Sequence, residues 1–327
     1  MRPLRLGPKS PETGDKVTRA MNMSTAVEGY WLARKRDFSQ NTINDYSLTF
    51  RRFVAFTGDP DIETVGADHL HKFLNHLDEM GLAPKTQANA WTALSSLWTW
   101  AAVALGVPHV VSGKVKRPKT RRVQPVPFTQ AEVRLLLASC DQMAPYITNT
   151  GQRVQSPRPT AQRDRAMMMV MLDTGIRVSE LTALKIRDYT PATGEARIGH
   201  GKGDKARSVF LGQAARQSVW LYLSTRLYPV DVAPLFISRG PGNALDRIAV
   251  LRMVKRAGER VGVVGAHPHK FRHTFAINFL RNGGNPLELQ KLLGHEKMDT
   301  VRLYVDYASA DLEAAQRKAS PADGWKL

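Results

Sequence analysis

The stretch from His269 to Tyr304 constrains the fold of this chain more than any other segment. It reads HKFRHTFAINFLRNGGNPLELQKLLGHEKMDTVRLY. Pro268 sets φ for a helix start, and the residues GGNP at 283–286 end that helix and open the next. Gly294 suits the left-handed position that closes the second helix. The histidine, arginine and tyrosine side chains of the stretch therefore converge only if helices joined by tight turns bring them together.

These side chains suit chemistry at a phosphodiester. When a phosphodiester is attacked, charge develops on its non-bridging oxygens, and without a metal only Arg, Lys, His and backbone N–H groups can stabilise it. A tyrosine hydroxyl can act as a covalent nucleophile. Because its pKa is about 10, it needs a base or a strongly cationic pocket. The stretch supplies both kinds of group.

Four motifs in this order resemble the tyrosine recombinase (phage integrase) family. The family signature is His-x-x-Arg, then Leu-Gly-His, then Tyr nine residues later, with an arginine box and a lysine hairpin before them. The matching segments are TGIRVSELTAL at 174–184, GKGDKAR at 201–207, HKFR at 269–272 and LLGHEKMDTVRLY at 292–304. Any one alone would be weak evidence, but four in order across residues 120–310 are not expected by chance.

The resemblance implies a covalent strand-transfer mechanism. Tyr304 is expected to attack the scissile phosphate, forming a 3′-phosphotyrosyl link and freeing a 5′-hydroxyl that attacks the partner duplex. His269 is expected to act as the base toward Tyr304. Lys202, in the hairpin turn, is expected to protonate the leaving 5′-oxygen, a role for which Lys205 and Arg207 compete.

The resemblance also implies an electrostatic clamp on the phosphate. Arg177 and Arg272 are expected to bind the non-bridging oxygens in a fork, and His295 to donate a further hydrogen bond. Because the phosphotyrosyl link conserves the bond energy, neither a metal nor a nucleotide cofactor is expected.

The charge of the chain predicts a polyanionic partner. Lys and Arg number 47 against 29 Asp and Glu, which gives a net charge of +18 and a pI near 10.2. Residues 1–120 hold 16 basic and 11 acidic residues, and the rest of the chain holds 31 and 18. Most of the excess therefore lies in the part that carries the motifs, and double-stranded DNA is the expected partner.

Amphipathic patterns divide the chain into segments. Residues 1–20 are expected to be a flexible leader and residues 21–111 a four-helix module that resembles the family's core-binding (SAM-like) domain. The proline-bearing, basic segment 112–127 is expected to be a linker, and residues 128–327 the catalytic domain with a C-terminal tail helix. The expected fold class is mainly α with a small antiparallel β-sheet (α+β), because the glycine-rich turn near residue 202 predicts a β-hairpin.

Polar and basic side chains on helix faces, in the linker and near the hairpin are the expected DNA contacts, although a solvated face is the alternative reading of each. They are Arg51, Arg52, Lys85, Thr86, Gln87, Lys114, Lys116, Arg117, Lys119, Arg121, Arg122, Lys205 and Arg207.

Local signals refine the catalytic domain. Thr129 and Glu132 form a capping box at a helix start. Residues 140–163 contain glycine and prolines, which predicts a long irregular insertion. The apolar segment Arg165–Thr174 is expected to be a core helix, in which a methionine run fills space.

The single cysteine, Cys140, excludes an internal disulfide, and no Cys/His cluster has zinc-ligand spacing. No uninterrupted apolar run reaches about 18 residues, so no membrane span is expected. We expect a cytoplasmic, nucleoid-associated protein.

Two other classes share part of this pattern. A type IB topoisomerase would use similar chemistry on one duplex, and a non-catalytic DNA-binding regulator would keep the fold but lose a catalytic residue. The larger integrases of this family carry an extra arm-binding domain before the core-binding domain. Nothing about 65 residues long precedes the four helices in this sequence, so a Xer-like or small-element recombinase is expected. Such an enzyme is expected to join paired DNA sites as a homotetramer that exchanges a tail helix starting near Ser309, with packing of that helix on its own subunit as the alternative.

Overall fold

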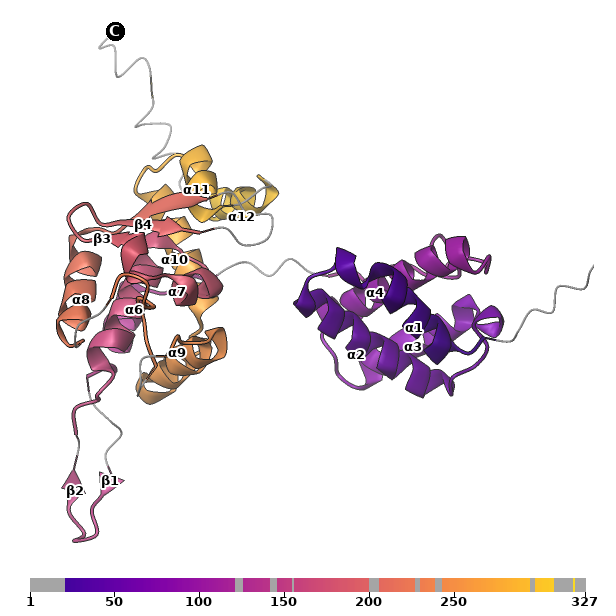
Figure 1. Ribbon diagram of the computed structural model, residues 1–327, viewed down its shortest axis with the longest axis horizontal. Coiled ribbons are helices and arrows are strands. Elements are labelled where there is room, and N and C mark those ends of the chain that lie inside the picture. Colours follow the sequence, from indigo (N-terminus) through magenta and orange to yellow (C-terminus); the bar gives the residue numbers. More distant parts are fainter. Residues whose placement is uncertain are drawn as a thin grey trace, which may run out of the picture. The chain divides into compact units, whose positions relative to one another are not determined.

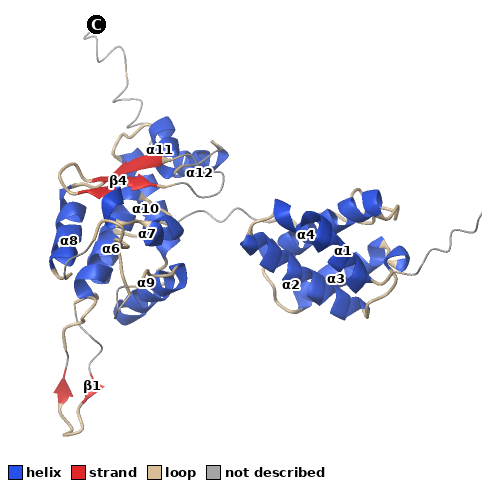
Figure 2. Cartoon of the chain, in the orientation of Figure 1, coloured by secondary structure: helices blue, strands red, loops and turns tan. Residues whose placement is uncertain are grey.

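The protein is seen in a computed structural model that describes residues 21–120, 126–141, 146–154, 156–199, 206–226, 230–238, 243–294, 298–308 and 320. The chain divides into two compact units, residues 1–122 and 123–327. In the part of the chain that the structure describes, both consist mainly of helices, and strands occur only in the second (Figure 2). Among the described residues, no helix is long and apolar enough to cross a membrane.

Over residues 21–120, the N-terminal unit contains four α-helices, as its apolar spacing predicted (Figure 1). They are α1 (Met23–Arg34), α2 (Gln40–Thr57), α3 (Ala67–Glu79) and α4 (Pro84–Ala104), with 3-10 turns at Lys35–Asp37 and Ile62–Thr64. Ser39 caps α2 by accepting a hydrogen bond from the backbone N–H of Thr42, and Pro84 opens α4, where a missing N–H costs no helix bond.

Aromatic side chains form the centre of this unit. The ring of Phe53 contacts those of Phe73 and Trp98 edge-on, at centroid distances of 5.1 and 5.8 Å. Val115 is buried in the same core, and Trp91 Nε1 donates to its carbonyl at 3.0 Å. The segment expected to be a linker from residue 112 is therefore anchored to the N-terminal unit as far as Val115.

The second unit surrounds one buried helix, α6. Its elements are α5 (Gln130–Ala138), β1 (Tyr146–Ile147), β2 (Arg153–Val154), α6 (Ala161–Thr174), α7 (Val178–Ala183), β3 (Tyr189–Thr190), β4 (Glu195–Ile198), β5 (Arg207–Phe210), α8 (Gln213–Ser224), α9 (Arg247–Val261), α10 (Pro268–Arg281), α11 (Pro286–Leu293) and α12 (Asp299–Ala308). Helices α8 and α10 pack against α6 (Figure 1). The methionine run fills the core as predicted, because Met167, Met168 and Met171 are almost fully buried.

The predicted hairpin is part of a three-stranded antiparallel sheet in the order β3-β4-β5. Ala196 faces Val209 in the register, and both side chains are buried against the core. Strand β3 was not predicted, since two residues are too few to show an alternating pattern. The tip of the hairpin, residues 200–205, lies outside the described residues.

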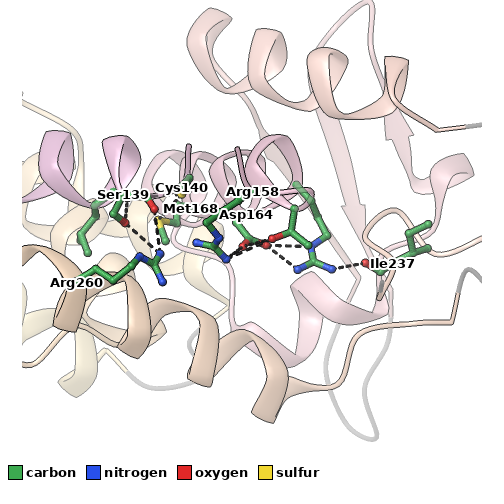
Figure 3. A network of polar contacts seen from close by, with 10 residues as sticks. Ser139, Cys140, Arg158, Asp164, Met168, Ile237 and Arg260 are labelled. Carbon is green, nitrogen blue, oxygen red and sulfur yellow. Dashed lines mark hydrogen bonds and ion pairs between the residues drawn. The ribbon is translucent and has the colours of Figure 1, made fainter. Parts of the chain in front are cut away.

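A buried carboxylate organises the region that the sequence indicated to be irregular. Asp164 is fully buried and accepts hydrogen bonds from Arg158, Thr160 and Arg163, and Arg163 also donates to the carbonyl of Ile237 at 2.9 Å (Figure 3). Two corrections to the expected 140–163 insertion follow. Helix α6 begins at residue 161 rather than 165, and the paired strands β1 and β2 lie within the insertion.

Candidate active site

Three arginines from different parts of the chain converge on the C-terminal end of α11. Arg207 Nε donates to the carbonyl of Leu292 at 2.8 Å, Arg272 Nη2 to that of Leu293 at 2.8 Å, and Arg177 Nη2 to that of Gly294 at 2.9 Å. The last carbonyls of a helix have no partner within it, and they carry the negative end of its dipole. Three cations therefore satisfy three successive carbonyls and fix this helix end in place.

The helix ends where the sequence predicted. Gly294 adopts the left-handed conformation with φ 63°, and a Cβ there would lie 2.9 Å from a guanidinium nitrogen of Arg207. The close approach of Arg207 therefore requires glycine. His295 follows this turn, but residues 295–297 lie outside those described.

Glu180, in the first turn of α7, joins two of these arginines. Its carboxylate accepts hydrogen bonds from Arg177 Nη1 at 2.8 Å and from both terminal nitrogens of Arg207 at 2.9 and 2.8 Å. It also caps α7 through the backbone N–H of Arg177. Burial alone would raise the pKa of Glu180, but the hydrogen bonds from Arg207 and Arg177 hold it below its usual value. Glu180 therefore supports the arginines and caps the helix.

Arg272 lies at the centre of the cluster. It is 2 % exposed, and its Nη1 donates to the carbonyl of Gly175 at 2.7 Å. Burial, followed by the neighbouring charge of Arg177, lowers the pKa of Arg272 to about 10, so the group stays cationic at neutral pH. Its position depends on Gly175, which ends α6 in the left-handed conformation and exposes that carbonyl.

Tyr304, on α12, is also buried, with 2 % of its surface exposed. Its hydroxyl lies 3.0 Å from Nδ1 of His273, a residue on α10 to which we had assigned no role. His269, the expected partner of Tyr304, lies one turn earlier on α10, with an exposed side chain and its ring 4.8 Å from that of His273. The Tyr304 hydroxyl is therefore hydrogen-bonded to His273, and the base role expected of His269 stays a prediction. In the sequence, the only indication of a role for His273 was its position directly after Arg272 of the motif.

Some expected DNA contacts are solvent-exposed in the structure. In the N-terminal unit, the residues with exposed side chains are Arg51, Lys85, Thr86, Lys114, Lys116, Arg117 and Lys119, and Arg52 is half-buried. Arg121, Arg122, Lys202 and Lys205 lie outside the described residues.

Two expected DNA contacts are corrected by the structure. Gln87 is 8 % exposed, and its amide donates to Asp78 and to the carbonyl of Leu82 at 2.8 and 2.9 Å. Its side chain therefore serves the helical unit and does not face solvent. Arg207 has a side chain that is only 10 % exposed, since its guanidinium is held by Glu180 and Leu292. Its guanidinium therefore supports the cluster.

The cluster has the features that phosphate chemistry requires. Guanidinium groups held in place by carbonyls and a carboxylate do not reorganise when charge develops on an oxyanion beside them. Tyr304 and Leu293 share one apolar cluster, so a potential nucleophile lies next to the helix end that the arginines bind.

Comparisons with known proteins identify the family of this chain. The profile described as "Phage integrase family" matches residues 127–310, and that described as "Phage integrase, N-terminal SAM-like domain" matches residues 32–103. The tyrosine recombinase XerC of Mycobacterium sp. (strain JLS) is 30% identical over 302 residues, which are 89% of this chain and 96% of the relative. XerC of Proteus mirabilis is 29% identical over 86% of this chain and 89% of its own length.

Solved structures share the fold. The XerH site-specific recombinase bound to a palindromic difH substrate aligns with a TM-score of 0.68 at 24% identity, covering 90% of this chain and 84% of its own. The Tn1549 transposon integrase in complex with a circular intermediate DNA aligns with a TM-score of 0.70 at 19% identity, covering 90% and 99%. Since the catalytic profile spans more than half of the sequence and the Xer relatives align over most of it, this chain belongs to the phage integrase family of tyrosine recombinases.

Proposed function

We propose that this protein is a site-specific DNA recombinase that cleaves and rejoins DNA through a 3′-phosphotyrosyl link at Tyr304. One observation carries the proposal. Arg177 and Arg272, from separate motifs, donate to the consecutive carbonyls of Gly294 and Leu293, next to the apolar cluster that contains Tyr304. Cations held in this way suit the oxyanion of a phosphoryl transfer, and the proposed nucleophile lies beside them.

The remaining roles rest on the sequence motifs. In the proposed reaction Arg177 and Arg272 bind the non-bridging oxygens, His295 donates a further hydrogen bond and Lys202 protonates the leaving 5′-oxygen. The motif assigns the base role toward Tyr304 to His269, whose side chain is exposed on the same helix as Arg272, and His273 on that helix is the alternative base.

Covalent trapping tests the proposal. A duplex library nicked near candidate sites loses a short 5′-hydroxyl strand after cleavage, so the covalent protein–DNA complex accumulates. Peptide mapping should then find DNA joined to Tyr304. Adducts on another residue, or none on any genomic sequence of the source cell, would contradict the proposal. Holliday junctions from two site-bearing duplexes separate recombination from topoisomerase-like relaxation.

The proposed partner is double-stranded DNA carrying paired sites, bound by a homotetramer whose subunits exchange their C-terminal tails. A groove of about 800 Å³ on the catalytic unit supports this part. It is lined by residues of α5, α6, β5 and α10, including Phe210, Phe275 and Phe279, and Phe210 is 59% exposed. Residues 309–319 of the tail, which carry Leu312 and several alanines, lie outside the described residues and are the proposed occupant.

Mixing two defective proteins tests the exchange. A chain truncated after Ala308 keeps the groove but lacks the tail, and Phe210→Glu keeps the tail but carries a charge in the groove. Each alone should bind single sites and fail to bind paired sites cooperatively. Their mixture should regain part of the cooperativity, because the tail of one fits the groove of the other. No recovery on mixing would favour a tail that packs on its own subunit, and full cooperativity of the truncated chain would rule out exchange.

The setting of the proposed reaction follows from its partner. A transposon integrase in complex with a circular intermediate DNA shares the fold, so mobile-element DNA is one candidate substrate. We place the reaction in the cytoplasm, at the nucleoid.

A further inference from the structure

The hydrogen bond between α10 and α12 gives the nucleophile a specific partner. Nδ1 of His273 and the hydroxyl of Tyr304 are 3.0 Å apart, and their ring centroids are 5.6 Å apart. The two residues are 31 positions apart in sequence and belong to different helices. Because Tyr304 is 2 % exposed, the protein surroundings, rather than bulk water, govern the proton of its hydroxyl.

The surroundings of His273 keep its side chain uncharged at neutral pH. Burial, followed by the nearby His269, His267 and Arg272, lowers the pKa of His273 to about 4. Burial also raises the pKa of Tyr304, an effect that Arg272 partly offsets. At neutral pH the imidazole is therefore uncharged and the phenol protonated. A neutral imidazole has one nitrogen that donates and one that accepts. In the tautomer with the ring proton on Nε2, Nδ1 accepts from the tyrosine O–H, and a proton transfer from Tyr304 to His273 requires this tautomer.

We propose that His273 is a catalytic residue that accepts the proton of Tyr304 as its oxygen attacks the scissile phosphate. This inference rests on the proposed function. The Tyr304 oxygen–phosphorus bond forms while the bond from phosphorus to the 5′-oxygen breaks. The tyrosine proton moves to Nδ1 of His273, and the leaving oxygen takes a proton from a separate acid, assigned above to Lys202. Ligation reverses both transfers, so His273 returns its proton to the released tyrosine.

The attack and the proton transfer depend on each other. In the DNA-free protein a phenol does not give its proton to so weak a base, which prevents premature ionisation of the nucleophile. A phosphodiester brought to Arg177 and Arg272 carries negative charge, and that charge favours an imidazolium beside it. His273 thus becomes a stronger base when the substrate is in place.

The neighbouring His269 provides the matched comparison. Both histidines lie on α10 with their rings in contact, and both lie close to Arg272. Only His273 has a recorded hydrogen bond to the Tyr304 hydroxyl among the described residues. Replacing either one removes a histidine from the same helix. Only the variants of His273 should regain cleavage rate when the hydroxyl at position 304 is made more acidic.

Single-turnover cleavage of a trapping substrate tests the inference. Wild type, His273→Phe, His273→Asn and His269→Asn are each made with tyrosine or with 3,5-difluorotyrosine at position 304. His273→Phe should lower the rate of adduct formation by roughly 10²- to 10⁴-fold, the usual contribution of a general base. Difluorotyrosine has a more acidic hydroxyl and needs less help from a base. It should therefore recover much of the loss in the two His273 variants, but little in His269→Asn.

The outcomes separate cleanly. A His273→Phe rate within about threefold of wild type, or a His273 defect that difluorotyrosine does not relieve, overturns the inference. Relief confined to His269→Asn assigns the base role to His269 instead. His273→Asn keeps a polar group near the position of Nδ1, so it provides a folded variant if Phe is not tolerated. If wild type itself forms no adduct at Tyr304, the proposed function fails, and the inference fails with it.

Discussion

Glu180 and Arg207 form a two-pronged ion pair, with N–O distances of 2.9 and 2.8 Å, between residues 27 positions apart. The pair joins the arginine motif at the start of α7 to the first residue of β5. The shared carboxylate also holds Arg177, so the hairpin and the phosphate clamp are parts of one electrostatic unit.

Replacing Glu180 should destabilise the catalytic unit. Glu180→Gln leaves the largely buried guanidinium group of Arg207 without its carboxylate, and removes the same charge from the partly exposed Arg177. Breaking a buried ion pair in this way typically costs about 3 to 5 kcal/mol. Urea unfolding of the full chain measures it. The matched control is Glu259→Gln, which removes an exposed partner of Lys255 and should change stability by less than about 1 kcal/mol. Equal effects of the two substitutions would contradict the role given to Glu180.

Replacing the nucleophile should separate chemistry from binding. Tyr304→Phe removes a hydroxyl but no charge, so adduct formation should stop while DNA affinity stays nearly unchanged. The lost hydrogen bond to His273 should lower stability by about 1 kcal/mol. Gel-resistant adducts and filter binding give the two readouts. If the Phe variant still forms adducts, Tyr307 is the next candidate nucleophile.

Lysine at position 177 or 272 should not support cleavage at the wild-type rate. Arg272 donates to two carbonyls through different nitrogens, and an ammonium group cannot reproduce that fork. Removing one preorganised donor to an oxyanion typically lowers kcat by about 10²- to 10³-fold. Single-turnover cleavage by Arg177→Lys and Arg272→Lys measures the loss, and near wild-type rates would count against the clamp. EDTA should leave wild-type cleavage unchanged.

Stability should fall as the pH drops from about 6.5 toward 4. The pKa of His273 falls from 6.5 to about 4 on folding, so in this range the unfolded chain binds more protons than the folded chain. The group therefore contributes stability above pH 6.5 that is lost as the pH approaches 4, by at most about 3 kcal/mol. Unfolding curves at several pH values should show a shallower pH dependence for His273→Asn than for wild type. Parallel curves would show that the histidine does not contribute.

Gly175→Ala should lower the stability of the protein more than Gly58→Ala does. Gly175 has φ 60°, and a Cβ would lie 2.5 Å from Phe275 Cδ1 and 2.9 Å from Leu293 Cδ2. Gly58 also has a positive φ, 76°, but nothing lies within 4 Å of a Cβ there. Gly58→Ala should therefore show only the left-handed penalty of about 1 to 2 kcal/mol. Thermal unfolding should show a larger loss of stability for Gly175→Ala than for Gly58→Ala. Gly175→Ala should also lower the rate of cleavage, because Arg272 binds the Gly175 carbonyl.

Features with local causes were predictable from the sequence. The capping box of Thr129 and Glu132 and the left-handed Gly294 depend on nearby residues, and the structure confirms both. The hairpin followed from alternating residues around a glycine-rich turn, and its strands β4 and β5 pair as expected.

Features that depend on distant partners were not predictable in the same way. Helix α6 begins early because Asp164 is buried among arginines, one of which, Arg158, precedes the helix. The burial of Gln87 depends on Asp78, which belongs to another helix. The partnership of His273 with Tyr304 needs the packing of α12 on α10, and no spacing along the chain specifies it.

The separate packing of the nucleophile helix has a consequence for evolution. Tyr304 and Val301 of α12 join Ile277, Leu289 and Leu293 in a small cluster distinct from the large core around α6. Local opening requires less free energy where fewer apolar contacts must break. Mutations in this small cluster can therefore alter when the tyrosine is presented while the large core keeps the domain folded. Selection can therefore act on the timing of strand cleavage among variants that all remain folded and able to bind DNA.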